Sequence, residues 1–186
     1  TYAGGLGMLA ADLMRSAADL HLPAACITMC WRHGYLRQKI NDDGTQDYQD
    51  ITWDKHEHLR PLDQRITITL EGKDVQVGVW VYDMQSGDHV VPIYFLDTDL
   101  PENEQWARDI TNHLYGGDGR MRVMQEAVLG IGGVRMLRQL GYHDVDTYHM
   151  NEGHAAFLTL ELLKERDYQD DAVRKSCAFT THTPVK

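Results

Sequence analysis

The chain has 186 residues, of which 42% are hydrophobic and 25% charged, and a formal net charge of −10 at pH 7, the composition of an ordinary globular domain. The scattered acidic residues argue against a nucleic-acid partner, and no apolar run is long enough to span a bilayer, so we expect no membrane partner. Cys26, Cys30 and Cys177 lack the spacing of a disulfide framework, and we therefore expect a reduced, cytoplasmic protein.

A glycine-rich turn, Gly4-Gly5-Leu6-Gly7, opens the chain and leads into a predicted helix over 7–20, whose apolar stripe contains Leu9, Leu13 and Ala17. Such a turn brings backbone N–H groups close to an anion, and the positive end of the helix points to the same place. The pattern therefore predicts a phosphate site. Because no strand precedes the turn, we expect the chain to be a piece of a larger protein. The alternative is a tight turn whose glycines only permit close helix packing.

The next segments favour β-structure. Residues 24–31 form an apolar run typical of a strand covered on both faces, and 34–40 form a second extended piece closed by a turn at 41–44. Alternating apolar residues on both sides of a short turn predict an antiparallel hairpin over 66–81. A further strand is expected over 90–96, where Pro92 indicates an edge strand or a strand start.

The second half of the chain favours alternating helices and strands. Residues 97–119 are polar, with a short helix around Trp106, and a long helix is predicted over 120–140. Gly130, Gly132 and Gly133 inside this helix are tolerable only where another backbone comes close, since each costs about 1 kcal/mol against alanine. The remaining predicted elements are a strand over 145–150, helices over 152–164 and 168–175, and a strand over 176–181.

Strand–helix–strand alternation implies parallel pairing. The predicted fold class is therefore α/β: a Rossmann-like parallel sheet in a single unit, 1–186, with an antiparallel hairpin inserted at about 64–96.

Two polar clusters lie where predicted strands end, the edge at which open α/β sheets bind ligands. The first contains Asn151, Glu152 and His154, and the second contains His182. An imidazole at such an edge can donate to a sugar hydroxyl. The alternatives are helix capping by Asn151 and Glu152 and a surface turn at His182. With the glycine turn, these clusters place three ligand-competent groups at the edges of one sheet.

The remaining histidines, aromatic residues and carboxylates are more typical of structural or surface positions than of a binding site. His149 and His154 are five residues apart across a strand–helix junction, and His56 and His58 have no third ligand in view, so we expect no metal. The segment 31–35 can line a cleft, although packing is the commoner role of such aromatic residues. The carboxylates at 97–102 are expected to be solvated loop residues.

Seven stretches together carry a family resemblance. They are YAGGLGMLAADLMRSAADL, WRHGYLRQKI, VPIYFLDTDLPEN, NHLYGGDGR, VLGIGGVRMLRQLG, YHMNEGHAAF and FTTHTPV. In this order they resemble the α-glucan phosphorylases (glycogen, starch and maltodextrin phosphorylases), and the shorter bacterial and archaeal branch in particular. The resemblance implies a part of the N-terminal lobe of a two-lobed glycosyltransferase-type enzyme.

That family cleaves the terminal α-1,4-linked glucose of a glucan with inorganic phosphate, giving glucose 1-phosphate, and uses the phosphate group of pyridoxal phosphate (PLP) as a proton relay. By resemblance, Gly4 and Gly5 offer backbone N–H groups to the phosphates of substrate and cofactor, and Leu6 packs near the sugar. His182 matches the histidine that contacts the glucose and helps to stabilise the transition state. The implied glucose pocket is also lined by three residues of the preceding cluster, Asn151, Glu152 and His154. Glu152 stands where the animal enzymes tend to carry aspartate.

The resemblance also implies limits. The family's Schiff-base lysine lies in the C-terminal lobe, and Lys186 is in the wrong position to be that lysine. We therefore expect the isolated chain to be inactive and to hold no PLP, and the parent enzyme to be a homodimer or a higher homo-oligomer.

Three alternatives from other classes remain. A nucleotide-sugar-dependent glucan synthase-type glycosyltransferase shares the two-lobed architecture but uses no PLP. A nicotinamide-dependent oxidoreductase has only the pattern Gly5-Leu6-Gly7-Met8-Leu9-Ala10 in its favour, without the preceding strand or the ribose-binding acid. A non-catalytic glucan-binding module would need exposed aromatic rows, and none is evident in the sequence.

Overall fold

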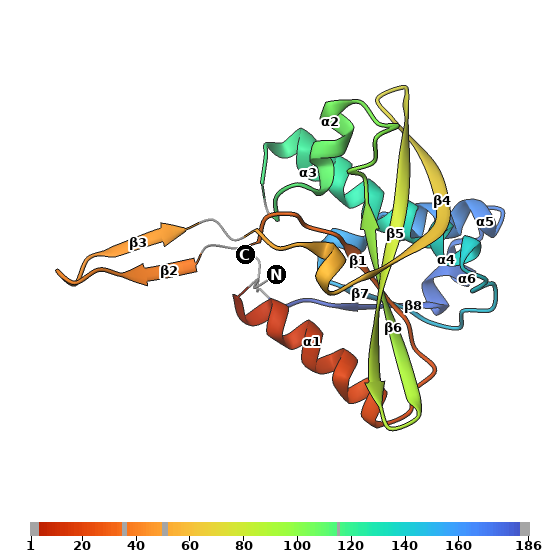
Figure 1. Cartoon of the computed structure of the whole chain (residues 1–186). Coiled ribbons are helices and arrows are strands. Elements are labelled where there is room, and N and C mark those ends of the chain that lie inside the picture. The colour runs from red at the N-terminus through yellow and green to blue at the C-terminus, as the bar shows by residue number, and fades with distance from the viewer. Residues whose placement is uncertain (1–3, 35–36, 50–51, 115, 183–186) are drawn as a thin grey trace.

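A computed structural model describes residues 4–34, 37–49, 52–114 and 116–182 of the chain. The helices are α1 (Gly4–Asp19), α2 (Gln105–Arg108), α3 (Gly119–Ala127), α4 (Gly133–Gln139), α5 (Leu158–Glu165) and α6 (Asp170–Lys175). The strands are β1 (Cys26–Met29), β2 (Arg37–Ile40), β3 (Gln46–Gln49), β4 (Arg60–Leu70), β5 (Lys73–Ser86), β6 (His89–Asp97), β7 (Tyr148–Asn151) and β8 (Cys177–Thr180). Figure 1 shows this arrangement. Among the described residues, no helix is both long and apolar enough to cross a membrane.

The main sheet has the strand order β1-β6-β5-β4. β1 pairs with β6 in parallel, and the other two pairs are antiparallel. The predicted hairpin is confirmed: β4 and β5 are joined by Glu71-Gly72, both with positive φ (50° and 78°), as two-residue turns between twisted strands require. The hairpin continues the sheet that contains β1 and β6.

Pro92 does not mark an edge strand, because β6 lies between β1 and β5. Pairing with β1 begins only at Ile93, whereas Pro92 itself lies opposite Asp83 of β5. The prediction is therefore wrong for the strand as a whole, although the proline precedes the part of β6 that has a strand on both sides.

One helical segment covers a face of this sheet. α3 continues through a π-helical turn, Val128–Gly132, into α4, and the three together form the long helix predicted over 120–140. Side chains from this segment and from the sheet form the main core. Its buried members are Met29, Ile66, Ile68, Val75, Val77, Val79, Val81, Tyr94, Leu96, Ala107, Ile110, Met124, Val128 and Met136.

The predicted close approach of another backbone is confirmed at only one glycine of this segment, Gly130. A Cβ on Gly130 would lie 2.6 Å from the backbone nitrogen of Leu158 and 2.8 Å from the carbonyl carbon of Phe157. A Cβ on Gly133 would lie 3.2 Å from Ile27 Cγ2, whereas one on Gly132 would make only ordinary contacts, the nearest at 3.5 Å. Glycine is therefore strictly required at Gly130, which lies against the start of α5.

Helix α1 packs on β5 and β6, and the predicted apolar stripe is confirmed at Ala17 but not along its whole length. Ala17 and Ala18 are buried against Val91, whereas Leu9 and Leu13 are each 46% exposed. The predicted buried stripe is therefore wrong at both leucines. The small alanine side chains let the helix lie close to the sheet, and this contact decides which side of α1 is buried.

β7 and β8 form a second, two-stranded sheet. They pair in parallel, with Tyr148 opposite Cys177 and Asn151 opposite Thr180, and α5 and α6 connect them. The α/β class and the parallel pairing are thus confirmed. In the described structure, however, the two parallel pairs belong to separate sheets rather than to one.

The two strands β2 and β3 form an arm that projects from the body of the protein (Figure 1). The turn 41–44 closes it as predicted, with Gly44 at φ 82°. All eight strand residues of the arm are exposed.

Candidate functional site

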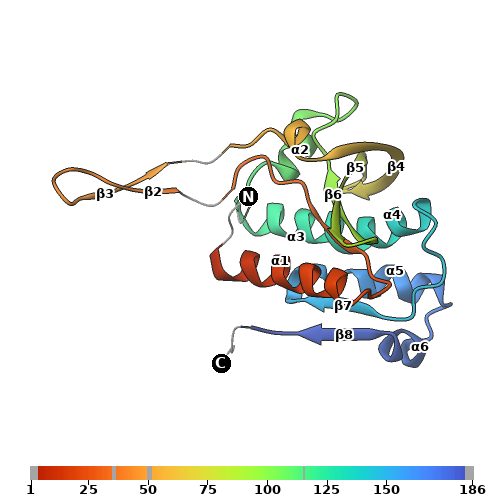
Figure 2. The same cartoon turned by 60° about the horizontal axis from the view of Figure 1, so that its bottom comes forward.

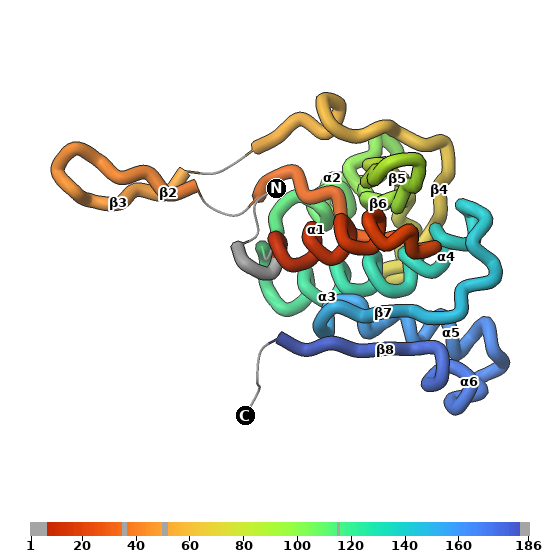
Figure 3. The backbone as a smooth tube through the Cα atoms, turned by 90° about the horizontal axis from the view of Figure 1, so that it is seen from below, coloured from red at the N-terminus to blue at the C-terminus, as the bar shows by residue number. Residues whose placement is uncertain are grey.

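The three predicted polar groups lie at the same end of the protein. In Figure 2 the start of α1 and the carboxyl ends of β7 and β8 all lie on the left, and Figure 3 shows the two strand ends on the same side. The predicted single sheet edge is wrong in detail, because only β7 and β8 share a sheet. The shared end of the molecule is nevertheless what a common ligand site requires.

The Asn151 and His182 side chains are in contact. His182 Nε2 lies 2.6 Å from Asn151 Oδ1, and the backbone N–H of His182 donates to the carboxylate of Glu152. The hydroxyl of Thr181 donates to the same carboxylate at 3.5 Å. Since the imidazole faces an amide oxygen, Nε2 carries the proton in this contact and Nδ1 is the acceptor in the neutral ring.

Glu152 occupies the N-cap position of a 3-10 turn, but its side chain makes no capping hydrogen bond, so the alternative of helix capping by this side chain is wrong. Its backbone has φ 66° and ψ −179°, a region that glycine favours. Asn151 is the last residue of β7, and after a 3-10 turn, Gly153–Ala155, the α-helix begins only at Leu158. The N–H of Glu152 donates to the carbonyl of Thr180 at 2.8 Å, which extends the β7–β8 pairing by one hydrogen bond.

His154 has a different environment. It lies in the 3-10 turn and lines a small cavity of about 40 Å³ with Met29, Trp31 and Arg122, among others. The structure thus brings Asn151, Glu152 and His182 together and places His154 beside the end of β1 and the start of the long helical segment.

Gly4 and Gly5 lie in the first turn of α1 rather than in a turn before it. The N–H groups of a first helical turn have no intrahelical acceptor, and this turn carries no acidic residue. The backbone is therefore suited to an anion. Leu6 belongs to the same turn. Lys186 lies outside the described residues.

A larger cavity of about 710 Å³ lies at the carboxyl ends of the parallel strands β1 and β6. Its lining is mostly polar: Cys30, Trp31, Arg32, His33, Thr52, Trp53, Asp54, Lys55, Asp97, Asp99, Gln105, Arg108, Asp109, Thr111 and Asn112. Within the segment 31–35, Trp31, Arg32 and His33 therefore do line a cleft. The expectation of solvated carboxylates is wrong for Asp97, which is 1% exposed.

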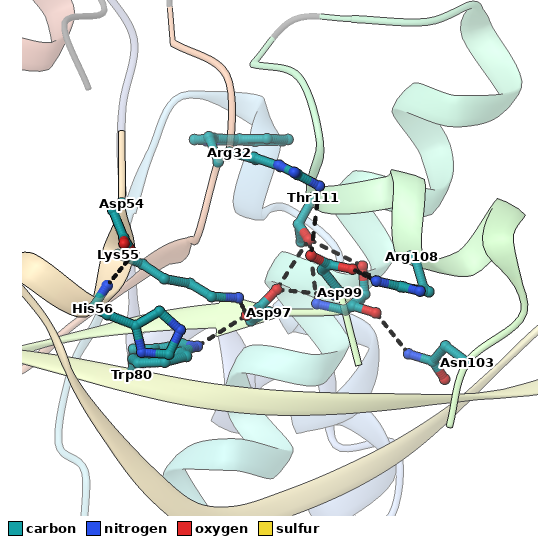
Figure 4. A network of polar contacts seen from close by, with 12 residues as sticks. Arg32, Asp54, Lys55, His56, Trp80, Asp97, Asp99, Asn103, Arg108 and Thr111 are labelled. Carbon is teal, nitrogen blue, oxygen red and sulfur yellow. Dashed lines mark hydrogen bonds and ion pairs between the residues drawn. The ribbon is translucent and has the colours of Figure 1, made fainter. Parts of the chain in front are cut away.

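Asp97 is the centre of a buried network at this cavity (Figure 4). Its Oδ2 accepts from Lys55 Nζ at 2.5 Å and from the indole N–H of Trp80 at 2.9 Å. Its Oδ1 accepts from the backbone N–H of Asp99 at 2.9 Å, and Arg108 Nε donates to Asp99 at 2.7 Å. Each carboxylate is thus matched to a cation. Burial, assisted by the nearby Asp97, raises the pKa of the Cys30 thiol to about 12.

Sequence reasoning missed this cavity although a signal was present. Trp31 follows β1, and Asp97 and Asp99 end and follow β6. Had β1 and β6 been recognised as parallel neighbours, their carboxyl ends would have predicted a second polar edge. Among the residues that the structure describes, no group of three or more His, Cys, Asp or Glu side chains could hold a metal ion.

Comparison with known proteins gives curated relatives, although no family model matches the chain. The chain is 39% identical over 99% of its length to the glycogen phosphorylase of Mycobacterium tuberculosis. It is 36% identical to the maltodextrin phosphorylase of Thermococcus litoralis and 34% identical to the glycogen phosphorylase of Aquifex aeolicus. It spans 23%, 23% and 28% of the lengths of these three relatives.

These identities extend over essentially the whole chain, so they do not depend on the short glycine pattern alone. The resemblance found in the sequence is confirmed: over essentially its whole length the chain is similar to a segment of α-glucan phosphorylases that makes up about a quarter of their length.

Proposed function

We propose that this chain is part of an α-glucan phosphorylase, which transfers the terminal α-1,4-linked glucose of glycogen, starch or maltodextrin to inorganic phosphate. The observation that carries the proposal is the contact between Asn151 and His182, at the same end of the protein as the start of α1. A sugar pocket needs such directional groups, and a phosphate needs the backbone N–H groups beside it.

Each residue has a physical role in this proposal. Asn151 Oδ1 orients the His182 imidazole, which presents a hydrogen-bonding edge to a glucose hydroxyl. Fixed dipoles of this kind stabilise the charge that develops in an oxocarbenium-like transition state. Glu152 holds the backbone of His182, so its role is to position the imidazole. His154 completes the implied pocket from the neighbouring turn.

The start of α1 fits the phosphate group of PLP as well as the substrate phosphate. Its first-turn N–H groups face outward from the helix end without a nearby acid on the same turn, and two phosphates brought together there need such donors to offset their repulsion. When bound, the cofactor phosphate supplies a group that donates and accepts protons. Gly4 and Gly5 would hold it in place.

The attachment lysine of PLP is expected outside this chain, which is why we propose that the isolated 186 residues do not turn over glucan. The whole enzyme is proposed to be a cytoplasmic homodimer or higher homo-oligomer. Phosphorolysis by the isolated chain would contradict the first of these proposals.

The test uses the natural full-length polypeptide that contains these residues. We expect it to release glucose 1-phosphate from maltoheptaose and phosphate. The H182A substitution should lower kcat by about 10²–10³, the usual loss of one preorganised donor at a transition state. The matched control is H143A, since His143 is exposed and precedes the first residue of β7, whereas Asn151 is the last residue of that strand. Equal activities of H182A and H143A would overturn the assigned role.

A second measurement separates this proposal from the synthase-type alternative. The full-length polypeptide should show the absorbance of a PLP Schiff base and require inorganic phosphate. Transfer from a nucleotide sugar without that absorbance would favour the synthase-type enzyme.

A further inference from the structure

A second polar contact joins β7 and β8 beside the one between Asn151 and His182. His149 Nε2 lies 2.7 Å from the hydroxyl oxygen of Thr180. His149 is exposed, so this hydrogen bond does not serve to satisfy a buried polar group. The position of the contact, on the two strands that carry the proposed glucose site, suggests a role in that site instead.

The two contacts have the same geometry. In the parallel register, His149 is opposite Ala178 and Asn151 is opposite Thr180. His149 reaches Thr180, two positions beyond its own partner. Asn151 reaches His182, again two positions beyond its partner. Because side chains two residues apart in a strand point to the same face, the His149 and Asn151 side chains lie on one face of the strand pair, and Thr180 shares this face.

Thr180 therefore lies between the two contacts. Neighbouring strands are about 4.8 Å apart, and Thr180 is directly opposite Asn151, so a rotated threonine hydroxyl can reach the asparagine amide. A hydroxyl both donates and accepts, and it would then compete with His182 for Asn151 Oδ1. The hydrogen bond to His149 holds the hydroxyl in another direction and leaves the amide oxygen to His182.

The end of β8 is fixed by two residues of the β7 side. In the part of the chain that the structure describes, β8 pairs with β7 alone, and the ends of such pairs are where local opening begins. Glu152 holds the backbone here: its N–H donates to the carbonyl of Thr180, and its carboxylate accepts from the N–H of His182. His149 holds the Thr180 side chain, so backbone and side chain are fixed separately.

We infer that His149 is a positioning residue of the proposed glucose site. It acts through the Thr180 hydroxyl, which it keeps away from Asn151, and so maintains the contact between Asn151 and His182. The inference rests on the proposed function, because it concerns the orientation of the imidazole that acts on the glucose. Since His149 affects the reaction only through His182 in this role, its effect must depend on the presence of that imidazole.

The experiment measures phosphorolysis of maltoheptaose by the full-length polypeptide. H149A should lower kcat by about twofold to tenfold, the effect of about one hydrogen bond, with KM unchanged because the oriented imidazole acts in the transition state. H149Q should restore most of kcat, since its amide can bond to the hydroxyl in place of Nε2. Full activity of H149A, or an equal loss in H149Q, would overturn the inference.

The matched control for H149A is H89A. His89 Nε2 likewise makes a contact at 2.9 Å, to the carbonyl oxygen of Leu22, which lies beyond the other end of α1. We expect H89A to have the kcat of the unmodified polypeptide. A loss in H89A as large as that in H149A would show a general effect of removing such a histidine and would contradict the inference.

A second background separates positioning from a structural role. H182A has no imidazole to orient, so H149A should not lower kcat further in that background. An equal loss in both backgrounds would contradict the inference. T180V replaces the hydroxyl with a methyl group and should match H149A, and the double variant H149A/T180V should be no less active than either single variant. Losses that multiply in the double variant would likewise contradict it.

Crystal structures of H149A and H149Q provide a readout that does not depend on turnover. His182 Nε2 should leave Asn151 Oδ1 in H149A and remain beside it in H149Q. An unchanged contact in H149A would overturn the inference. Absence of phosphorolysis by the unmodified polypeptide, together with loss of the contact in H149A, would instead contradict the proposed function and leave the positioning by His149 supported.

Discussion

Replacing Gly130 with alanine tests the packing that positions the candidate site. The new Cβ would lie 2.6 Å from the nitrogen of Leu158 and 2.8 Å from the carbonyl carbon of Phe157. Both are backbone atoms at the start of α5, and they cannot rotate away. Overpacking of this kind costs about 1–3 kcal/mol, and alanine returns about 1 kcal/mol through its better helix propensity. We therefore expect G130A to lower the free energy of unfolding by up to about 2 kcal/mol.

G132A is the matched control, because the nearest contact of its Cβ is an ordinary 3.5 Å. Only the gain in helix propensity remains there, and we expect stability to be unchanged or to rise by up to about 1 kcal/mol. Urea and thermal unfolding of the three proteins measure the difference, with about 2–4 °C in Tm for each kcal/mol in a domain of this size. If G130A is as stable as G132A, the close approach of α5 to Gly130 is not a constraint and the reasoning fails.

Three further predictions concern the buried and strained groups. D97N should lower the free energy of unfolding by about 3 kcal/mol in urea titrations, because it leaves the charge of the partly buried Lys55 unpaired, whereas D83N, at an exposed ion pair, should cost less than about 1 kcal/mol. Burial raises the thiol pKa of Cys26 to about 11 and of Cys30 to about 12, from an ordinary value of 9.0. The contribution of these two neutral thiols to the free energy of unfolding is full below pH 9 and is lost as the pH rises toward 11–12. Mass spectrometry should find both thiols unalkylated by iodoacetamide at pH 8 until the protein is unfolded. E152G should relieve about 1 kcal/mol of backbone strain yet lower kcat of the full-length enzyme, and an unchanged kcat would remove the positioning role of the carboxylate.

The parts of the fold that sequence reasoning found are those with strong local signals. The β4–β5 hairpin was predictable because Ile66 and Ile68 alternate with threonines and because Glu71-Gly72 suits a two-residue turn. The close approach at Gly130 was predictable because glycine inside a helix needs a reason. Each of these signals can be recognised from the residues of a single segment, even where, as at Gly130, the partner lies elsewhere in the chain.

The features that the sequence could not predict depend on partners far along the chain. Asp97 is buried because Lys55, 42 residues earlier, reaches its carboxylate, and no local pattern contains that pairing. The buried side of α1 is set by Ala17 and Ala18 meeting Val91. Apolar residues lie on both sides of that helix, so periodicity alone could not choose between them.

Glu152 shows why local sequence patterns did not predict the geometry of the candidate site. Asparagine followed by glutamate before an apolar run is typical of a helix start, but here the chain turns through a conformation that costs about 1–3 kcal/mol for a residue other than glycine. The glutamate carboxylate and N–H both bind the end of β8, and these bonds hold the strained backbone in place. The consequence is that Asn151 and His182, 31 residues apart, meet at 2.6 Å. Like the buried pair at Asp97, this arrangement is costly for stability and lies at the carboxyl ends of parallel strands, the edge at which open α/β sheets bind ligands.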